Sequence, residues 1–137
     1  MAGTGSLSFA LQQQGINIRA TDNFSWDKHN NWNEDENYWT GIENIDAIEA
    51  VKKYGENIDV IIMSWPYMDD IAVKVLHTMR DVNPNCIMIY IGEEDGGCTA
   101  NDEFFETIEE IEDQEFKNAV SNFKRWWGIY DCPQLVK

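Results

Sequence analysis

Two apolar runs separated by an amphipathic stretch constrain the fold of this chain more than any other pattern in it. The runs are Asp59–Met63 and Cys86–Ile91, and both are rich in large apolar and β-branched residues, which is typical of strands buried in a parallel sheet. Between the runs, apolar residues recur at the spacing of one helix face: Met68, Ile71, Ala72, Val75, Leu76 and Met79. A strand, a helix and a second strand in this order predict an α/β fold.

Shorter patterns nearer the N-terminus continue the alternation of helices and strands. Residues 6–14 predict a short helix with Ser6 as its N-cap. Ile16–Thr21 alternates between apolar and polar residues and predicts a strand. Residues 39–45 predict a further strand, and Asp46 then caps a second helix.

The remaining segments predict a long loop and a C-terminal hairpin. Residues 23–38 are polar but hold several aromatic side chains, and their length indicates either a binding loop or a surface excursion. Thr99 begins a capping-box pattern with Asp102, which predicts the start of another helix. Phe116–Phe123 and Ile129–Val136 predict two antiparallel strands.

Composition excludes several classes of function. The chain has 137 residues, of which 10 are basic and 25 acidic, and its formal net charge of −15 disfavours nucleic acid and anionic membrane surfaces as partners. No apolar run approaches the roughly 18 residues of a membrane span. The three cysteines show no pairing at metal-ligand spacing, so we expect no metal site and a reduced, cytoplasmic protein.

A glycine-rich loop, Gly3-Thr4-Gly5, lies at the start of the chain. In α/β nucleotide-binding folds such a loop joins a strand to a helix, because glycine lets the backbone approach a ligand and the helix N-terminus offers free amides. An acidic residue about 20 positions later accepts hydrogen bonds from a ribose. Asp22 stands 19 positions after Gly3, directly after a predicted strand. The loop and the acid together predict a nucleotide-type ligand.

A second motif, Ser64-Trp65-Pro66-Tyr67, follows the first apolar run. It is similar to the [DNS]-P-P-[YFW] motif of amino-directed methyltransferases. Together with the glycine loop, it makes the chain resemble the class I S-adenosylmethionine-dependent methyltransferases. Trp65 stands where that motif has its first proline, which is a departure from the pattern. The stretches around this motif and around residues 96–99 also resemble a group of uncharacterised methyltransferase-like proteins.

The resemblance implies S-adenosylmethionine as the cofactor and assigns it a binding site near the N-terminus. The loop Gly3-Thr4-Gly5 would contact the methionine part of the cofactor. Asp22 would accept hydrogen bonds from the ribose hydroxyls, and Asp46 would accept one from the adenine amino group.

For the methyl acceptor, the resemblance implies two catalytic residues at the end of a later strand. Ser64 would accept a hydrogen bond from a target amine, and Tyr67 would stack on a planar substrate. Methyl transfer from a sulfonium needs alignment more than acid–base chemistry. The acceptor itself is left open, as a small molecule or a protein.

These observations combine into one predicted fold, a single methyltransferase-like domain over residues 1–137. We expect a Rossmann-like, doubly wound and mostly parallel sheet with a C-terminal antiparallel hairpin, in which the first strand is absent because the loop begins at residue 3. A missing central strand would expose two sheet edges. Either the neighbouring strands close on one another, or a second copy of the chain covers the gap as a homo-oligomer.

Two other functions stay open at this point. One is a non-catalytic Rossmann-like interaction module or truncated remnant that binds no cofactor. The other is a dinucleotide-binding oxidoreductase, although its G-x-G-x-x-G fingerprint would need glycine or alanine where Ser8 stands. Individual residues also have purely structural alternatives, since Asp22 could start a turn and Asp46 could be a plain helix cap.

Overall fold

Helices and strands alternate along the chain in a computed structural model that describes residues 1–25 and 38–137. The long loop predicted over residues 23–38 therefore lies largely outside the described residues. The chain divides into two units, Met1–Ala50 and Val51–Lys137. The α/β class is confirmed by the order of the elements. The doubly wound Rossmann-like arrangement stays a prediction.

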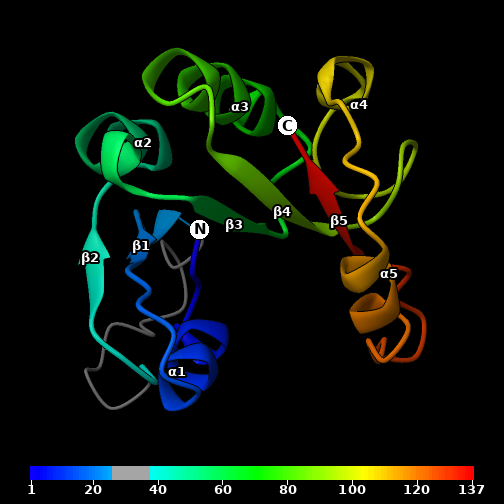
Figure 1. Ribbon diagram of the computed structural model, residues 1–137, viewed down its shortest axis with the longest axis horizontal. Coiled ribbons are helices and arrows are strands. Elements are labelled where there is room, and N and C mark those ends of the chain that lie inside the picture. The colour runs from blue at the N-terminus through cyan, green and yellow to red at the C-terminus, as the bar shows by residue number, and fades with distance from the viewer. Residues whose placement is uncertain (26–37) are drawn as a thin grey trace. The chain divides into compact units, whose positions relative to one another are not determined.

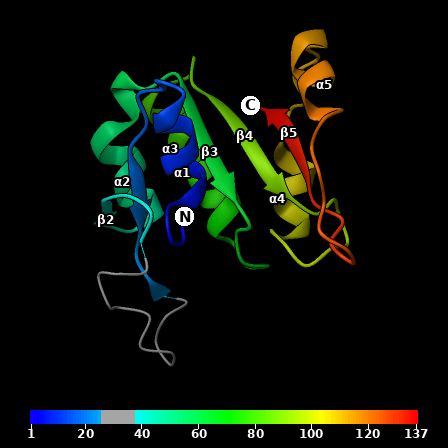
Figure 2. The same ribbon diagram turned by 90° about the horizontal axis from the view of Figure 1, so that it is seen from below.

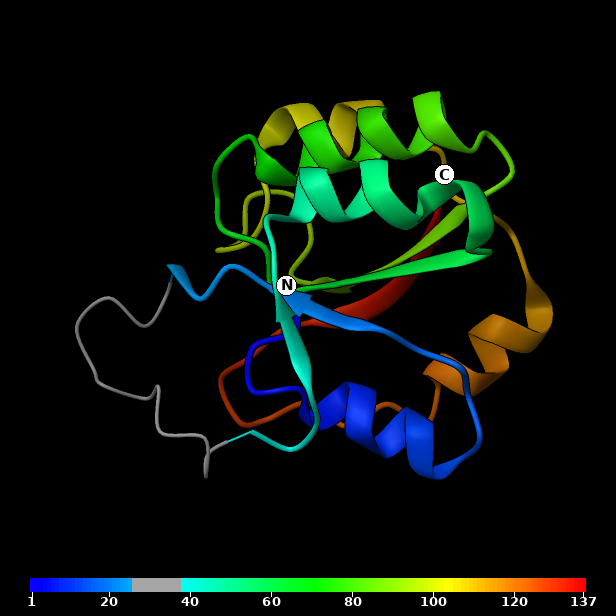
Figure 3. The same ribbon diagram turned by 90° about the vertical axis from the view of Figure 1, so that its left-hand side faces the viewer.

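The Met1–Ala50 unit is built around two short parallel strands, β1 (Ala20–Asp22) and β2 (Ile42–Asn44). Helix α1 (Ser6–Gln13) precedes them, and α2 (Ala47–Tyr54) begins directly after them. Figure 3 shows the arrowheads of β1 and β2 converging beside the start of the chain. The carboxyl ends of both strands thus lie next to the N-terminal loop.

Helix α1 begins one residue earlier than its sequence predicts. Gly5, rather than Ser6, is the N-cap, with φ of 79°, and no described side chain caps this end of the helix. Strand β1 is also shorter than the predicted Ile16–Thr21. The amide of Ile16 donates to the carbonyl of Leu11 at 3.1 Å. Ile16, the first residue of the predicted strand, is therefore bonded to the C-terminal end of α1 instead.

The Val51–Lys137 unit contains a mixed sheet of three strands in the order β3, β4, β5. Strands β3 and β4 are parallel, and β5 runs antiparallel to β4 (Figure 2). Helices α3 and α4 lie on the same side of this sheet (Figure 1). The elements of this unit are the 3-10 turn η3 (Gly55–Asn57), β3 (Val60–Ser64), α3 (Ile71–Val82), β4 (Ile87–Gly92), α4 (Asp102–Thr107), α5 (Gln114–Val120) and β5 (Cys132–Val136).

The core of this unit follows the helical stripe seen in the sequence. Four of the six stripe residues are buried, whereas Met68 lies before α3 and is exposed. Aromatic rings extend the core, since the Tyr90 and Phe104 centroids are 5.0 Å apart. The largest core side chains are at most 1% exposed: Tyr90, Phe104, Leu76, Met79 and Met88.

The predicted C-terminal hairpin is wrong. Residues 114–120 form helix α5, because Asp113 is an N-cap whose carboxylate accepts the Phe116 amide at 2.7 Å. Strand β5 pairs with β4 instead of with that segment. Its other edge is bonded by the chain after α4, where the Ile111 amide donates to the Leu135 carbonyl at 2.9 Å. This contact protects an edge that would otherwise be open.

Candidate functional site

The glycine loop and Asp22 meet at the carboxyl end of β1. The Gly3 amide donates to Oδ2 of Asp22 at 2.8 Å, which joins two residues 19 positions apart. The Ala2 amide donates to the Thr21 carbonyl at 3.0 Å, so the loop runs alongside the end of the strand. The structure therefore brings together the pair that the sequence spacing singled out.

The Asp22 carboxylate accepts backbone amides from both sides at this end of the unit. It is only 5% exposed, and its Oδ1 accepts the Phe24 amide at 2.7 Å. One carboxylate thus fixes both the glycine loop and the turn that leaves β1. Since hydrogen bonds to a carboxylate are among the strong ones, these two bonds hold the loop against the end of β1.

The two glycines of the loop are required for different reasons. Gly5 has φ of 79°, and a Cβ there would lie 2.9 Å from Cγ2 of Thr40, so a side chain fits neither the backbone nor the space. Gly3 has φ of 54°, and no described residue lies within 4 Å of its Cβ position. Gly5 therefore serves close packing, whereas Gly3 is not packed against any described residue. Between them, the Thr4 carbonyl accepts the Trp39 amide at 3.0 Å.

Asp46 lies at the same end of the unit as Asp22. Its Oδ1 accepts the Ile48 amide at 2.9 Å, so it does cap α2, and the neighbouring Ile45 amide donates to the Asp22 carbonyl at 3.1 Å. Burial lowers the pKa of the Met1 amino group, and the carboxylates of Asp22 and Asp46 both oppose that shift. Both acids are therefore close to one amine. The five predicted cofactor residues converge within this unit.

The two predicted catalytic residues belong to the Val51–Lys137 unit. Ser64 is the last residue of β3, is half-buried and is paired with Ile91 of β4. Tyr67 is 53% exposed. Between them, Trp65 adopts φ of 50°, a left-handed conformation that is a genuine outlier for a bulky residue. Its amide donates to the Ile91 carbonyl at 2.8 Å, which holds the strained turn against the end of β4.

Sequence reasoning missed Asp131, which is the partner of Trp65. The indole Nε1 of Trp65 donates to Oδ2 of Asp131 at 3.1 Å, across 66 positions of sequence. Asp131 is 8% exposed, and within the part of the chain that the structure describes its Oδ1 has no hydrogen-bond partner. The only sequence signal was the unusual tryptophan, whose N–H needs an acceptor when it is held against the protein.

A hydrogen-bond network around Glu93 orders the loop after β4. The hydroxyls of Tyr90 and Thr99 are 2.6 Å apart, and the Glu93 amide donates to Oγ1 of Thr99 at 2.8 Å. The buried Thr99 hydroxyl therefore links Tyr90 to the loop after β4, and Thr99 is not the predicted cap of α4. That cap is Asn101, whose side chain accepts the Phe104 amide at 3.2 Å. Burial raises the pKa of the Tyr90 phenol, which keeps it a neutral donor.

The Glu93 carboxylate ties two loops together. Oε2 accepts the Cys98 amide at 2.8 Å and Oε1 accepts the Tyr130 amide at 3.3 Å. These bonds lower the pKa of Glu93 below its ordinary value of 4.5. The residues before β5 are thereby anchored to the loop after β4.

Replacement of Glu93 by glutamine should remove part of the acid sensitivity of folding. Because the folded-state pKa is lowered, the ionised carboxylate stabilises the fold fully above the unfolded pKa, and this stabilisation is lost as pH falls through the folded value. The Tm difference between the wild type and Glu93→Gln should be largest at neutral pH and vanish well below about pH 4. Thermal scans across this range measure it, with the exposed neighbour Glu94→Gln as control. A difference that does not change with pH would contradict the assignment.

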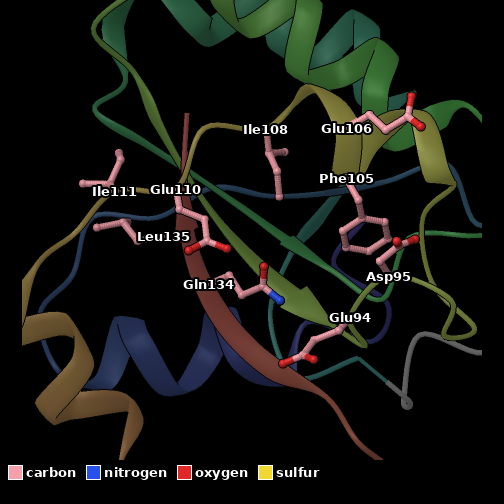
Figure 4. Close-up of a pocket in the computed structure, with 9 residues that line it drawn as sticks. All are labelled: Glu94, Asp95, Phe105, Glu106, Ile108, Glu110, Ile111, Gln134 and Leu135. Atoms are coloured by element: carbon pink, nitrogen blue, oxygen red, sulfur yellow. The ribbon is translucent and has the colours of Figure 1, made fainter.

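An open groove of about 520 Å³ lies elsewhere on this unit. Its side chains come from the loop after β4, from α4 with the segment that follows it, and from β5 (Figure 4). Four carboxylates line it beside apolar side chains, so it suits a cationic, partly apolar group better than an anion. The lining residues are Glu94, Asp95, Glu106 and Glu110 with Phe105, Ile108, Ile111, Gln134 and Leu135.

Searches for a metal site among the described residues and for similar proteins gave no assignment for these side chains. In residues 1–25 and 38–137, no group of three or more histidine, cysteine or acidic side chains is placed to hold a metal ion. No helix in those ranges has the length and apolar character needed to cross a bilayer. Comparisons with protein-family models, curated proteins and solved structures found no significant match.

Proposed function

We propose that this chain binds S-adenosylmethionine through its N-terminal loop and acts as a methyltransferase-like protein. The observation that carries the proposal is the 2.8 Å hydrogen bond from the Gly3 amide to Asp22. It ties a glycine loop to an acid at the carboxyl end of the following strand, and this end of an α/β sheet is where nucleotide-type ligands bind. The proposal includes the Rossmann-like, doubly wound sheet that the sequence predicts.

The residues near the loop supply the groups that such a ligand requires. No side chain of residues 1–25 or 38–137 caps helix α1, and the amides of its first turn are proposed to bind a polar ligand group. No described residue lies within 4 Å of the Gly3 Cβ position, and this side of the loop is proposed to take the methionine part. A carboxylate has about four acceptor positions, so Asp22 is proposed to accept ribose hydroxyls in addition to its backbone amides. Asp46 is half-buried and is proposed to accept the adenine amino group.

The methyl acceptor is proposed to be an amino group of a small molecule or a protein. The cofactor supplies a methyl group that is already activated as a sulfonium. Ser64 would then accept a hydrogen bond from the amine and orient its lone pair, and the exposed ring of Tyr67 would pack against the rest of the substrate. No further acid–base group is needed, because the amine can release its proton to water.

Isothermal titration with S-adenosylmethionine and with its demethylated product tests the cofactor. The wild type should bind both, and Asp46→Asn should bind about tenfold more weakly, which corresponds to about 1.4 kcal/mol. Asparagine still caps a helix, so α2 should persist. The amide nitrogen, however, replaces an acceptor by a donor that faces the adenine amino group. Asp81→Asn is the matched control, because it makes the same charge change at an exposed position of α3.

Three results separate the candidate functions when the titration is repeated with NAD⁺ as a third ligand. Absence of heat and of a thermal shift at millimolar concentrations of both ligands overturns the proposal and favours the interaction module. Heat with NAD⁺ alone favours the dinucleotide-binding oxidoreductase. Equal weakening in Asp46→Asn and Asp81→Asn would show a general charge effect and would remove Asp46 from the site. The expectations of a homo-oligomer and of a cytoplasmic location stay predictions.

A further inference from the structure

A tight turn between α5 and β5, here called the tryptophan turn (residues 124–130), exposes two indole rings. The Ile129 amide donates to the Trp126 carbonyl at 3.1 Å, and Gly128 has φ of 79°, a left-handed value that favours glycine. Trp126 is 80% exposed, and Trp127 at the tip is 100% exposed. Large apolar side chains that gather on one exposed surface mark an interaction site.

The tryptophan turn is fixed to the rest of its unit at both ends. Before it, the Phe123 amide donates to the Val120 carbonyl at 2.8 Å, at the end of α5. After it, the Tyr130 amide donates to Oε1 of Glu93 at 3.3 Å, and β5 follows. A binding element whose backbone is already ordered loses little conformational entropy when it docks. The turn is therefore suited to present its tryptophans to a partner.

Two cations directly precede the tryptophans. Lys124 and Arg125 are exposed, and neither forms an ion pair with any acid of residues 1–25 and 38–137. With 10 basic residues against 25 acidic ones in the chain, an adjacent pair of cations is an exception. Tryptophan and arginine are enriched among the residues that contribute most to binding energy at protein interfaces. The tryptophan turn thus combines cationic and apolar groups.

The acid-lined groove of the same unit has the complementary character. Its volume of about 520 Å³ lies within the range of sites that take a drug-sized group. Phe105 and Ile111 are half-buried and give it apolar walls. Figure 4 shows the exposed carboxylates of Glu94 and Glu110 on either side of Gln134. No residue of the tryptophan turn lines the groove of its own chain.

We infer that the tryptophan turn of one copy of this chain docks in the acid-lined groove of a second copy. The carboxylates meet Lys124 and Arg125, and the apolar walls meet the indole rings. Because turn and groove lie on one unit, two copies exchange turns reciprocally, which closes the assembly as a dimer. The net charge of −15 opposes association, but at about 0.1 M salt it is screened beyond about 10 Å, so the charges in contact decide. The inference does not rest on the proposed function.

Sedimentation equilibrium of the complete chain at about 0.1 M salt measures the association. The wild type should approach twice the mass of one chain as its concentration rises, and Trp127→Ser should weaken association at least tenfold. Trp127 is fully exposed, so this variant should keep the thermal midpoint of the wild type. Met68→Ser is the matched control, because Met68 is a 66% exposed apolar residue outside the groove, and it should associate as the wild type does.

Charge reversal tests whether turn and groove are partners of each other. The turn variant, Lys124→Glu with Arg125→Glu, places an acidic turn against an acidic groove. The groove variant, Glu94→Lys with Glu110→Lys, places a basic turn against a basic groove. Each alone should be monomeric, whereas an equimolar mixture should associate, because each chain then offers the other a turn of opposite charge.

The groove variant has its own control and the experiment has defined failures. Glu56→Lys with Asp81→Lys reverses two exposed acids outside the groove and should still associate alone. A wild type that stays monomeric at millimolar concentration overturns the inference and would assign the turn and the groove to other partners. Unchanged association of Trp127→Ser, or a mixture of folded variants that stays monomeric, also overturns it. If the groove variant does not fold, Trp127→Ser decides.

Discussion

Gly92→Ala should destabilise the Val51–Lys137 unit by about 2–5 kcal/mol. A Cβ at Gly92 would lie 2.5 Å from the Tyr90 hydroxyl oxygen and 2.7 Å from Oγ1 of Thr99, closer than real Cβ contacts come. Neither neighbour can move freely, because both side chains are buried and their oxygens are 2.6 Å apart in a hydrogen bond. The substitution must therefore separate two buried hydroxyls or displace the end of β4.

Urea unfolding measures this effect, and Gly41→Ala is its control. No described residue lies within 4 Å of the Gly41 Cβ position, and its φ is not left-handed, so alanine there should change the free energy of unfolding by less than about 0.5 kcal/mol. A Gly92→Ala variant as stable as Gly41→Ala would show that Tyr90 and Thr99 do not close over the end of β4.

The parts of the fold that sequence predicts well are those set by local periodicity. Buried stripe residues such as Leu76 and Met79 fall on one face of α3, as their spacing requires. The hairpin failed because the apolar residues in 116–123 suit either a strand or a helix. Asp113 decides for the helix by capping it, and β4 takes β5 as its partner.

In the candidate site, too, one contact could be predicted from the sequence and another could not. The contact between Gly3 and Asp22 is predictable, because a glycine turn and the end of the next strand meet at one sheet edge. The contact between Trp65 and Asp131 is not, because it spans 66 positions and depends on where β5 pairs. Thr99 shows a related limit, since its pattern suits a helix cap and only tertiary packing makes it the partner of Tyr90.

Asp22→Asn should reduce the affinity for S-adenosylmethionine about 100-fold or more, a larger loss than that expected for Asp46→Asn. Each oxygen of the Asp22 carboxylate accepts a backbone amide, from Gly3 at 2.8 Å and from Phe24 at 2.7 Å. Asparagine has one acceptor oxygen, so its NH₂ group must face one of these N–H donors. A buried donor without a partner costs about 1–3 kcal/mol, and the glycine loop loses its anchor in addition to the ribose acceptor.

The effect is larger because Asp22 is proposed to act both on the loop and on the ligand. Asp46→Asn keeps the α2 cap and removes only the proposed ligand contact. Loss of loop order and loss of a hydrogen bond together amount to about 2.7 kcal/mol, or 100-fold. Titration calorimetry measures the affinity for S-adenosylmethionine. The thermal midpoint of unfolding measures how much stability the hydrogen bonds from Asp22 to the loop contribute. Near-normal binding by a destabilised Asp22→Asn would mean that Asp22 serves the loop only. Normal values for both would contradict the hydrogen bonds on which the proposed function depends.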